Sequence, residues 1–224
     1  MTIWFASGNV HKQRELAAIL NTQENGALKS GAYNLLIPQD AGLDFDPDET
    51  ETSFHGNALL KARELYSLLE KRRPPLFRPG DPVIADDSGL CVDALDGRPG
   101  IYSARYASTP PPPPSHAPKL ESAERNALLL AELGDTSLRT ARFVCAMALL
   151  FGPDRFFLAQ ETFEGEIVKG LESVKGTGGF GYDPIFFIPE LGRTAAELSE
   201  TEKNTISHRA QAGKIIAGML KAYS

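Results

Sequence analysis

The order of hydrophobic and polar residues predicts a strand and then a helix at the start of the chain. Residues 2–6 form a short apolar run, which indicates a buried strand, and the turn-forming residues 7–9 follow it. From residue 10 to residue 20 the apolar side chains recur on one helical face, and Asn9 precedes them as a predicted N-cap. A glycine turn between a strand and a helix directs backbone N–H groups and the helix N-terminus toward whatever lies above the end of the strand.

The clearest helical pattern begins after Ser53, a second predicted N-cap. Apolar residues recur at intervals of four, four, three and four from Phe54 to Leu69. Further runs predict strands at residues 83–85, 90–95, 141–151 and 155–162, and helices at residues 119–133 and 205–220. Strands and helices that follow each other in mixed order predict an α/β fold.

Length and charge limit what such a fold can bind. The 224 residues predict one large domain, or two lobes that share a sheet. A content of 42% hydrophobic and 23% charged residues is typical of globular proteins and excludes a disordered or collagen-like chain. The net charge of −6 disfavours nucleic acid and anionic membranes as partners, because clustered cations drive both kinds of binding. We therefore expect no nucleic-acid partner and no membrane partner.

The two cysteines, Cys91 and Cys145, lie in apolar runs without metal-binding spacing, which argues against a disulfide framework or a zinc site. No segment reaches the ~18 apolar residues of a membrane span, and the N-terminus lacks the pattern of a signal peptide. These features predict a soluble cytoplasmic protein.

The glycine-rich segment 176–181 matches the spacing G-x-G-x-x-G but does not predict a dinucleotide site. That fingerprint requires a helix directly after it, whereas Pro184 here opens a strand-like run. Dense glycine allows the backbone to approach another group closely, and Phe180 and Tyr182 are available for stacking. An ordinary glycine-rich turn is the alternative.

Two groups of carboxylates predict a site for a hard cation. Asp86 and Asp87 follow the apolar strand at residues 83–85, and residues 44–51 hold five further acids with no compensating cation. Buried carboxylates need a counter-charge, and Mg²⁺ prefers oxygen ligands while it keeps several waters. The prediction depends on the fold bringing the two groups together.

Basic side chains suited to phosphate are dispersed along the chain at Lys12, Lys203, His208 and Arg209. The sequence contains no G-x-x-x-x-G-K-[ST], no H-E-x-x-H and no G-x-S-x-G, so it supports neither a P-loop enzyme nor the metalloprotease or hydrolase classes that those motifs mark. Residues Pro110–Pro114 predict a polyproline II surface insertion. The alternative interpretation, an interaction module that docks through polyproline, is supported by those prolines alone.

Five blocks of residues, in this order, resemble one family, the inosine triphosphate pyrophosphatases, which hydrolyse non-standard purine nucleoside triphosphates such as ITP, dITP and XTP. The blocks are Ser7–Lys12, Phe54–Ala62, Ala85–Leu90 with Pro99–Tyr106, Gly178–Pro184 and Lys203–Arg209. They extend from residue 7 to residue 209, so the resemblance covers nearly the whole chain.

The resemblance implies an elongated, two-lobed α/β fold around a central mixed β-sheet, with the active-site cleft between the lobes. It also implies a single domain over residues 1–224 and a homodimer. Asp87 is implied as the catalytic residue, both as metal ligand and as proton acceptor. The implied substrate-binding residues are Ser7, Gly8, Asn9, Val10, His11, Lys12, Ser88, Phe180, Gly181, Tyr182, Asp183, Lys203, His208 and Arg209.

The chain departs from the family pattern at the second metal ligand. Counting back from Phe54 gives Asp46, Asp48 and Glu49 as rivals, of which we favour Asp48 or Glu49. Gly56 stands where the family often has Glu. Residues 73–82 and 109–118 are expected to be surface insertions.

The residue chemistry and the resemblance agree on Mg²⁺-dependent hydrolysis of ITP, dITP and XTP to the monophosphate and pyrophosphate. A triphosphate carries about four negative charges, so an acidic protein must bind it with Mg²⁺. Cleavage at the α-phosphorus comes from the resemblance. The alternatives are a pyrophosphatase for pyrimidine or methylated nucleotides and a nucleotide sensor without turnover.

Overall fold

A computed structural model describes residues 1–22, 33–106 and 120–223. The helices are α1 (Val10–Leu20), α2 (Phe54–Arg72), α3 (Ser122–Leu133), α4 (Glu200–Ile206) and α5 (His208–Tyr223), and the strands are β1 (Thr2–Phe5), β2 (Asn34–Leu36), β3 (Val83–Val92), β4 (Thr140–Gly152), β5 (Arg155–Ile167), β6 (Phe186–Ile188) and β7 (Arg193–Thr194). The Pro110–Pro114 run and the predicted insertion at 109–118 lie outside the described residues. Residues 73–82 form a loop of turns between α2 and β3.

The described strands form one mixed sheet in the order β2-β1-β3-β4-β5-β6-β7. β1 pairs in parallel with both β2 and β3, whereas β6 pairs antiparallel with β5 and β7. This arrangement confirms the predicted α/β class and the mixed sheet. No helix of the described chain is both long enough and apolar enough to cross a membrane.

The chain divides into two compact units. The first contains residues 1–87, 145–161 and 209–224, and the second contains residues 88–144 and 162–208. The boundaries fall inside β3, β4 and β5, so each of these three strands contributes to both units.

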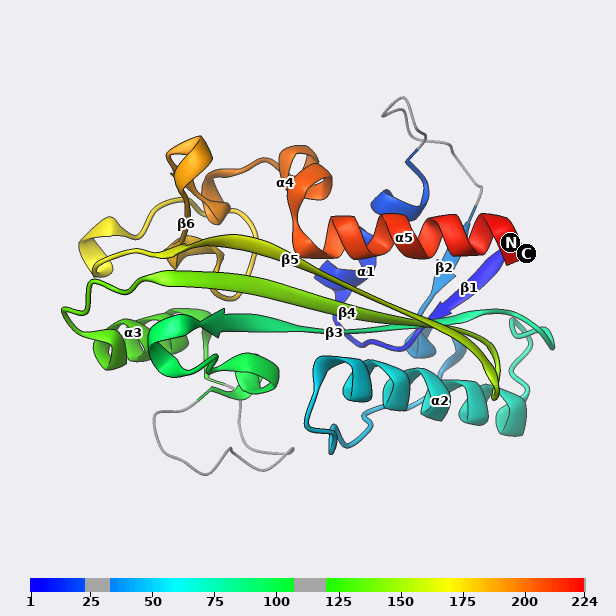
Figure 1. Cartoon of the computed structure of the whole chain (residues 1–224). Helices are drawn as coiled ribbons and strands as arrows, with labels where there is room; N and C mark the ends of the chain where they lie inside the picture. Colours follow the sequence, from blue (N-terminus) through cyan, green and yellow to red (C-terminus); the bar gives the residue numbers. More distant parts are fainter. Residues whose placement is uncertain (23–32, 107–119, 224) are drawn as a thin grey trace. The chain divides into compact units, whose positions relative to one another are not determined.

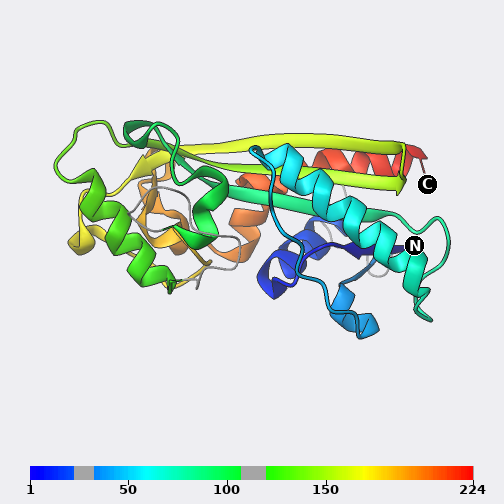
Figure 2. The ribbon, with the colours of Figure 1, turned by 90° about the horizontal axis from the view of Figure 1, so that it is seen from below.

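The first unit buries both faces of its strands, and alternate residues enter different cores. Ile3 and Phe5 belong to a cluster with Ile216 of α5, whereas Trp4 between them belongs to a cluster with Leu65 of α2. Successive strand residues point to opposite faces, which explains this division. α2 and α5 accordingly lie on opposite faces of these strands (Figures 1 and 2).

The second unit has its own core. Leu90 and Val92 of β3 pack in one cluster with Leu129 and Leu133 of α3 and with Phe186 of β6. The predicted helix at 119–133 is therefore present over the described residues, beginning at Ser122.

Two predicted boundaries are wrong. β3 runs without interruption through Asp86–Gly89, where the sequence predicted the end of one strand and the start of another. The helix predicted at 205–220 is divided, because Ser207 has extended backbone angles (φ −66°, ψ 158°) and separates α4 from α5. Lys203 consequently lies within α4, and His208 is the first residue of α5.

Candidate functional site

The side chains of the two neighbouring aspartates of β3 point to opposite faces of the first unit's strands. Because strand side chains alternate, Asp86 points to the face of α1 and α5, and Asp87 points to the face of α2. The contacts agree, since Asp86 meets Lys12 of α1 and Asp87 meets Lys61 of α2. These two acids are predicted together as possible metal ligands from the sequence. In the structure their side chains lie on opposite faces of the strand.

Asp86 is neutralised within the protein. It is 1% exposed, with Lys12 Nζ 3.1 Å and Arg209 Nη2 3.0 Å from its Oδ2. Burial alone would raise the pKa of Asp86, but the charges of Lys12 and Arg209 hold it below its ordinary value. Arg209 also pairs with Glu15 through Nη1 at 2.6 Å. Asp86 therefore orients two cations.

Asp87 shares a cation with the acidic loop. Lys61 Nζ lies 2.6 Å from Glu49 Oε1 and 3.5 Å from Asp87 Oδ1. Burial raises the pKa of Asp87, and the nearby Lys61 opposes that shift without cancelling it. Burial would lower the pKa of Lys61, yet Asp87 and Glu49 raise it, so Lys61 remains charged. The predicted proximity of strand and loop carboxylates is present for Asp87 and Glu49.

Asn57 connects these carboxylates to the helix. Its Nδ2 donates to Asp87 Oδ2 at 3.1 Å, and its Oδ1 accepts from the backbone N–H of Glu51 at 3.1 Å. Gly56 permits this close approach of the loop, because a Cβ at that position would lie 2.7 Å from Glu51 Cβ. The glycine at a position where the family often has Glu thus has a packing role in this chain.

The carboxylates Asp87 and Glu49 suit a hard divalent ion. No cluster of three or more His, Cys, Asp or Glu side chains is arranged to hold a metal in the described chain. Mg²⁺ does not need one, since it commonly takes one or two carboxylates together with waters and substrate phosphates. Glu49 Oε1 and Asp87 Oδ1 both lie near the ammonium group of Lys61, so these two carboxylate oxygens can face one positive charge. Glu49, rather than Asp48 or Asp46, is the loop acid that shares Lys61 with Asp87.

The turn from β1 into α1 has the predicted capping geometry. Asn9 Oδ1 accepts from the N–H groups of His11 (3.0 Å) and Lys12 (3.2 Å), and Ser7 Oγ accepts from the N–H of Asn9 (3.1 Å). Gly8, Val10 and His11 are exposed, with Val10 at 51%. The turn is ordered, and the ammonium group of Lys12 lies beside Asp86.

The glycine-rich segment of the second unit is held by Asp183. Its Oδ2 accepts from the backbone N–H of Phe180 (2.7 Å) and from Lys203 Nζ (2.6 Å). Gly179 has a positive φ of 69°, and a Cβ there would lie 2.0 Å from Asp183 Oδ2, so this contact requires glycine. Lys203 Nζ lies 4.9 Å from the centroid of the Phe180 ring. The segment continues into a 3₁₀ turn and β6, which confirms that the dinucleotide fold is absent here.

The remaining predicted residues of the second unit differ in burial. Tyr182 is 4% exposed in the core and donates its hydroxyl to the carbonyl of Ser103 (3.0 Å), whereas Phe180 is half-buried. His208 stacks on Phe143 with centroids 5.0 Å apart. Ser88 is half-buried on β3. Gly181 accepts a hydrogen bond from Asn126 of α3.

The fold and the first unit's side chains define an α/β protein whose acidic pair and cations suit a metal-bound phosphate ligand. A family model described as the Ham1 family matches residues 3–218, and the chain belongs to this family.

Similar proteins cover 93–100% of the chain. The dITP/XTP pyrophosphatase of Treponema denticola is 43% identical over 222 residues, which is 99% of each chain. The dITP/XTP pyrophosphatase of Exiguobacterium sibiricum is 44% identical over 214 residues, covering 93% of this chain and 97% of that protein. The solved Ham1 protein of Staphylococcus aureus matches with a TM-score of 0.77 at 36% identity and full coverage of both chains.

Sequence reasoning assigned no role to two residues that organise the site, although the block Phe54–Ala62 contains both. Asn57 and Lys61 lie four residues apart on α2, a spacing that places both on one helical face, and this was the available signal. Glu15 and Asn126 carried no signal, because their partners Arg209 and Gly181 are distant in sequence.

Proposed function

We propose that this chain hydrolyses non-standard purine nucleoside triphosphates, namely ITP, dITP and XTP, to the monophosphate and pyrophosphate. The observation that carries the proposal is the position of Lys61 between Asp87 and Glu49. Two carboxylates that can share a cation suit a metal–triphosphate complex, and members of the Ham1 family act on such nucleotides.

Magnesium held by Asp87 and Glu49 would neutralise phosphate charge and polarise the scissile phosphoanhydride. Lys12 and Lys61 contribute positive charge for the phosphate oxygens, and Asp86 keeps Lys12 oriented. Asp87 is the proton acceptor for the attacking water. Positioning and charge neutralisation account for most catalysis of phosphoryl transfer, so few covalent roles are needed.

We assign recognition of the purine base to Phe180 and Lys203 of the second unit. The Phe180 ring offers a surface for stacking, and the Lys203 ammonium beside it can donate to the 6-oxo group of hypoxanthine or xanthine. Adenine presents an amino group at that position, which would leave two donors facing each other. We therefore propose a strong preference for ITP and XTP over ATP.

A substrate panel tests the proposal. The chain is incubated with ITP, XTP, dITP, ATP and GTP, with and without Mg²⁺, and pyrophosphate and orthophosphate are measured separately. We expect Mg²⁺-dependent pyrophosphate release from the first three. Release of orthophosphate with IDP would overturn cleavage at the α-phosphorus, and equal efficiency on ATP and ITP would overturn the base preference. Binding without turnover would identify a sensor, and turnover only of pyrimidine or methylated nucleotides would identify a related pyrophosphatase.

We also propose an assembly and a compartment for the chain. The family resemblance supports a homodimer, and the apolar settings of Cys91 and Cys145 support a reducing compartment such as the cytoplasm. Light scattering coupled to size exclusion tests the dimer, and a monomer at working concentration would contradict it. Cell fractionation tests the compartment.

A further inference from the structure

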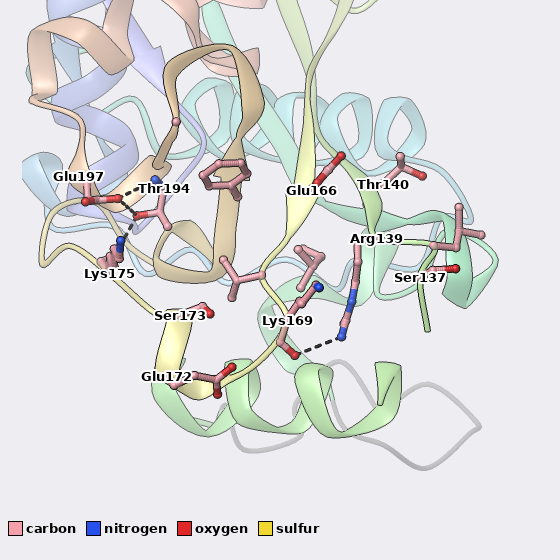
Figure 3. A pocket seen from close by; sticks show the side chains of 15 residues that line it. Ser137, Arg139, Thr140, Glu166, Lys169, Glu172, Ser173, Lys175, Thr194 and Glu197 are labelled. Carbon is pink, nitrogen blue, oxygen red and sulfur yellow. Dashed lines mark hydrogen bonds between the residues drawn. The ribbon is translucent and has the colours of Figure 1, made fainter. Parts of the chain in front are cut away.

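A cavity of about 640 Å³ lies in the second unit, apart from every residue assigned above to the nucleotide (Figure 3). It is lined by the start of β4, the end of β5 and segments around β6 and β7. Its volume falls within the roughly 300–1,000 Å³ of typical small-molecule sites. The cavity is therefore large enough for a small ligand of its own.

Arg139 is the cavity's distinctive group. The residue is 8% exposed, and its Nη2 donates to the carbonyl oxygens of Gly134 (2.6 Å) and Lys169 (3.1 Å). Its Nε and Nη1 are buried and have no hydrogen-bond partner within the described part of the chain. Guanidinium N–H groups are strong donors, and leaving them unpaired in the interior is costly.

The charge of Arg139 is also uncompensated. Over residues 1–22, 33–106 and 120–223, no carboxylate forms an ion pair with it. Glu197, one of the acids lining the cavity, instead accepts from the N–H and hydroxyl of Thr194. A buried cation without a counter-ion is strongly unfavourable. An anion in the cavity would supply the missing counter-charge beside the guanidinium group.

We propose that this cavity binds a small oxyanion, a carboxylate or a phosphate, through the guanidinium group of Arg139. The exposed Lys169 and Lys175 add positive charge to the lining. In Figure 3, Ser137 lies on the same side of the cavity as Arg139, and Lys175 lies across from them. A hydroxyl group and a guanidinium together suit the several acceptor oxygens of such a ligand.

The lining also limits the ligand's charge. Glu166 and Glu172 are exposed side chains of the same cavity and would repel a highly charged anion. A mono- or dianion is therefore favoured over a nucleoside triphosphate. This separates the cavity from the nucleotide site in ligand class as well as in location.

The experiment follows the Arg139 Nε–H resonance by NMR in the full chain. Inorganic phosphate and succinate are titrated separately, each against sodium chloride at equal pH and ionic strength. We expect a saturable shift of this resonance, and of the Gly134 and Lys169 amides, with at least one oxyanion. A response to phosphate alone assigns a phosphate ligand, and a response to succinate alone assigns a carboxylate. No saturable shift with either, or an equal shift with chloride, overturns the proposal.

Variants provide the matched comparison. Arg139→Gln should weaken the binding seen at the Gly134 and Lys169 amides by about tenfold or more, because a charge-assisted contact is lost. Arg142→Gln removes an equal charge from β4, at a residue that pairs with Asp93 and Glu164 and does not line the cavity, and should leave binding unchanged. Unchanged binding in Arg139→Gln would overturn the proposal. If Arg139→Gln does not fold, the wild-type titration alone decides.

Discussion

At the scale of single residues, Asp87 is the side chain on which the proposed chemistry depends most. Asp87→Asn keeps the side-chain volume and can still accept the hydrogen bond from Asn57. We expect the fold to persist and turnover of ITP to fall by about 10²- to 10⁴-fold, because a metal ligand and a proton acceptor are lost together. Steady-state pyrophosphate release and a thermal unfolding curve measure the two effects separately.

Glu64→Gln is the matched control for Asp87→Asn. Glu64 is an exposed acid on α2, three residues after Lys61, and its neutralisation also removes one negative charge. This variant should keep wild-type turnover. Near-normal turnover in Asp87→Asn would remove Asp87 from the mechanism.

Glu49 and Asp48 are adjacent, but they should differ in their effect on the metal. Glu49 shares Lys61 with Asp87. We expect Glu49→Gln to raise the Mg²⁺ concentration for half-maximal activity about tenfold or more, and Asp48→Asn to leave it nearly unchanged. A Mg²⁺ titration of both variants with ITP measures this. The reverse ranking would show that Asp48 is the ligand.

The sequence could predict which residue types the site uses, but not how they are paired. Asp87, Lys12 and the acidic loop followed from their chemistry and from the family resemblance. The division of Asp86 from Asp87 did not, because it depends on both residues lying inside one continuous strand. The role of Lys61 was not predicted, since it appears only when α2 lies against the Asp87 face.

At the scale of elements, two glycines of α5 predict opposite effects on stability. A Cβ at Gly213 would lie 2.8 Å from Ile19 Cγ2 of α1, whereas a Cβ at Gly218 would meet nothing within 4 Å. Gly218→Ala should raise the free energy of unfolding by roughly 0.5–1 kcal/mol, because alanine restricts the unfolded chain and favours helix. Gly213→Ala should lower it by about 1 kcal/mol, because overpacking exceeds that gain.

Urea denaturation of both variants beside the wild type measures the difference. Each variant is the control for the other, since both make the same substitution in the same helix. Stabilisation by Gly213→Ala would show that Ile19 can move aside at little cost. The contact between α1 and α5 would then be looser than the packing indicates.

Element boundaries were predictable where local capping sets them. Asn9 and Ser53 are the N-caps of α1 and α2 as predicted, because their side chains accept hydrogen bonds from backbone N–H groups of the first turn. Polar residues suggested a break in β3, yet the strand continues because tertiary pairing outweighs local β-propensity. The extended Ser207 between α4 and α5 carried no glycine or proline signal and was missed.

At the scale of the whole molecule, three strands belong to both compact units. The boundaries fall after Asp87 in β3, after Val144 in β4 and after Glu161 in β5. Neither unit can lose these strands without breaking the hydrogen-bonded sheet of the other. Because the two units share these strands, we expect that neither unit unfolds independently of the other, although each unit has its own core.

We expect a single cooperative unfolding transition for the chain. Pulse-labelling hydrogen exchange across a urea series can follow peptides from α1 in the first unit and α3 in the second. Their midpoints should coincide, and Gly213→Ala, which alters only the first unit, should shift both midpoints equally. If α3 kept its wild-type midpoint while α1 unfolded earlier, the two units would be separate folding domains that only share strands. Equal shifts would show that a packing defect between α1 and α5 is transmitted to the second core through the shared sheet.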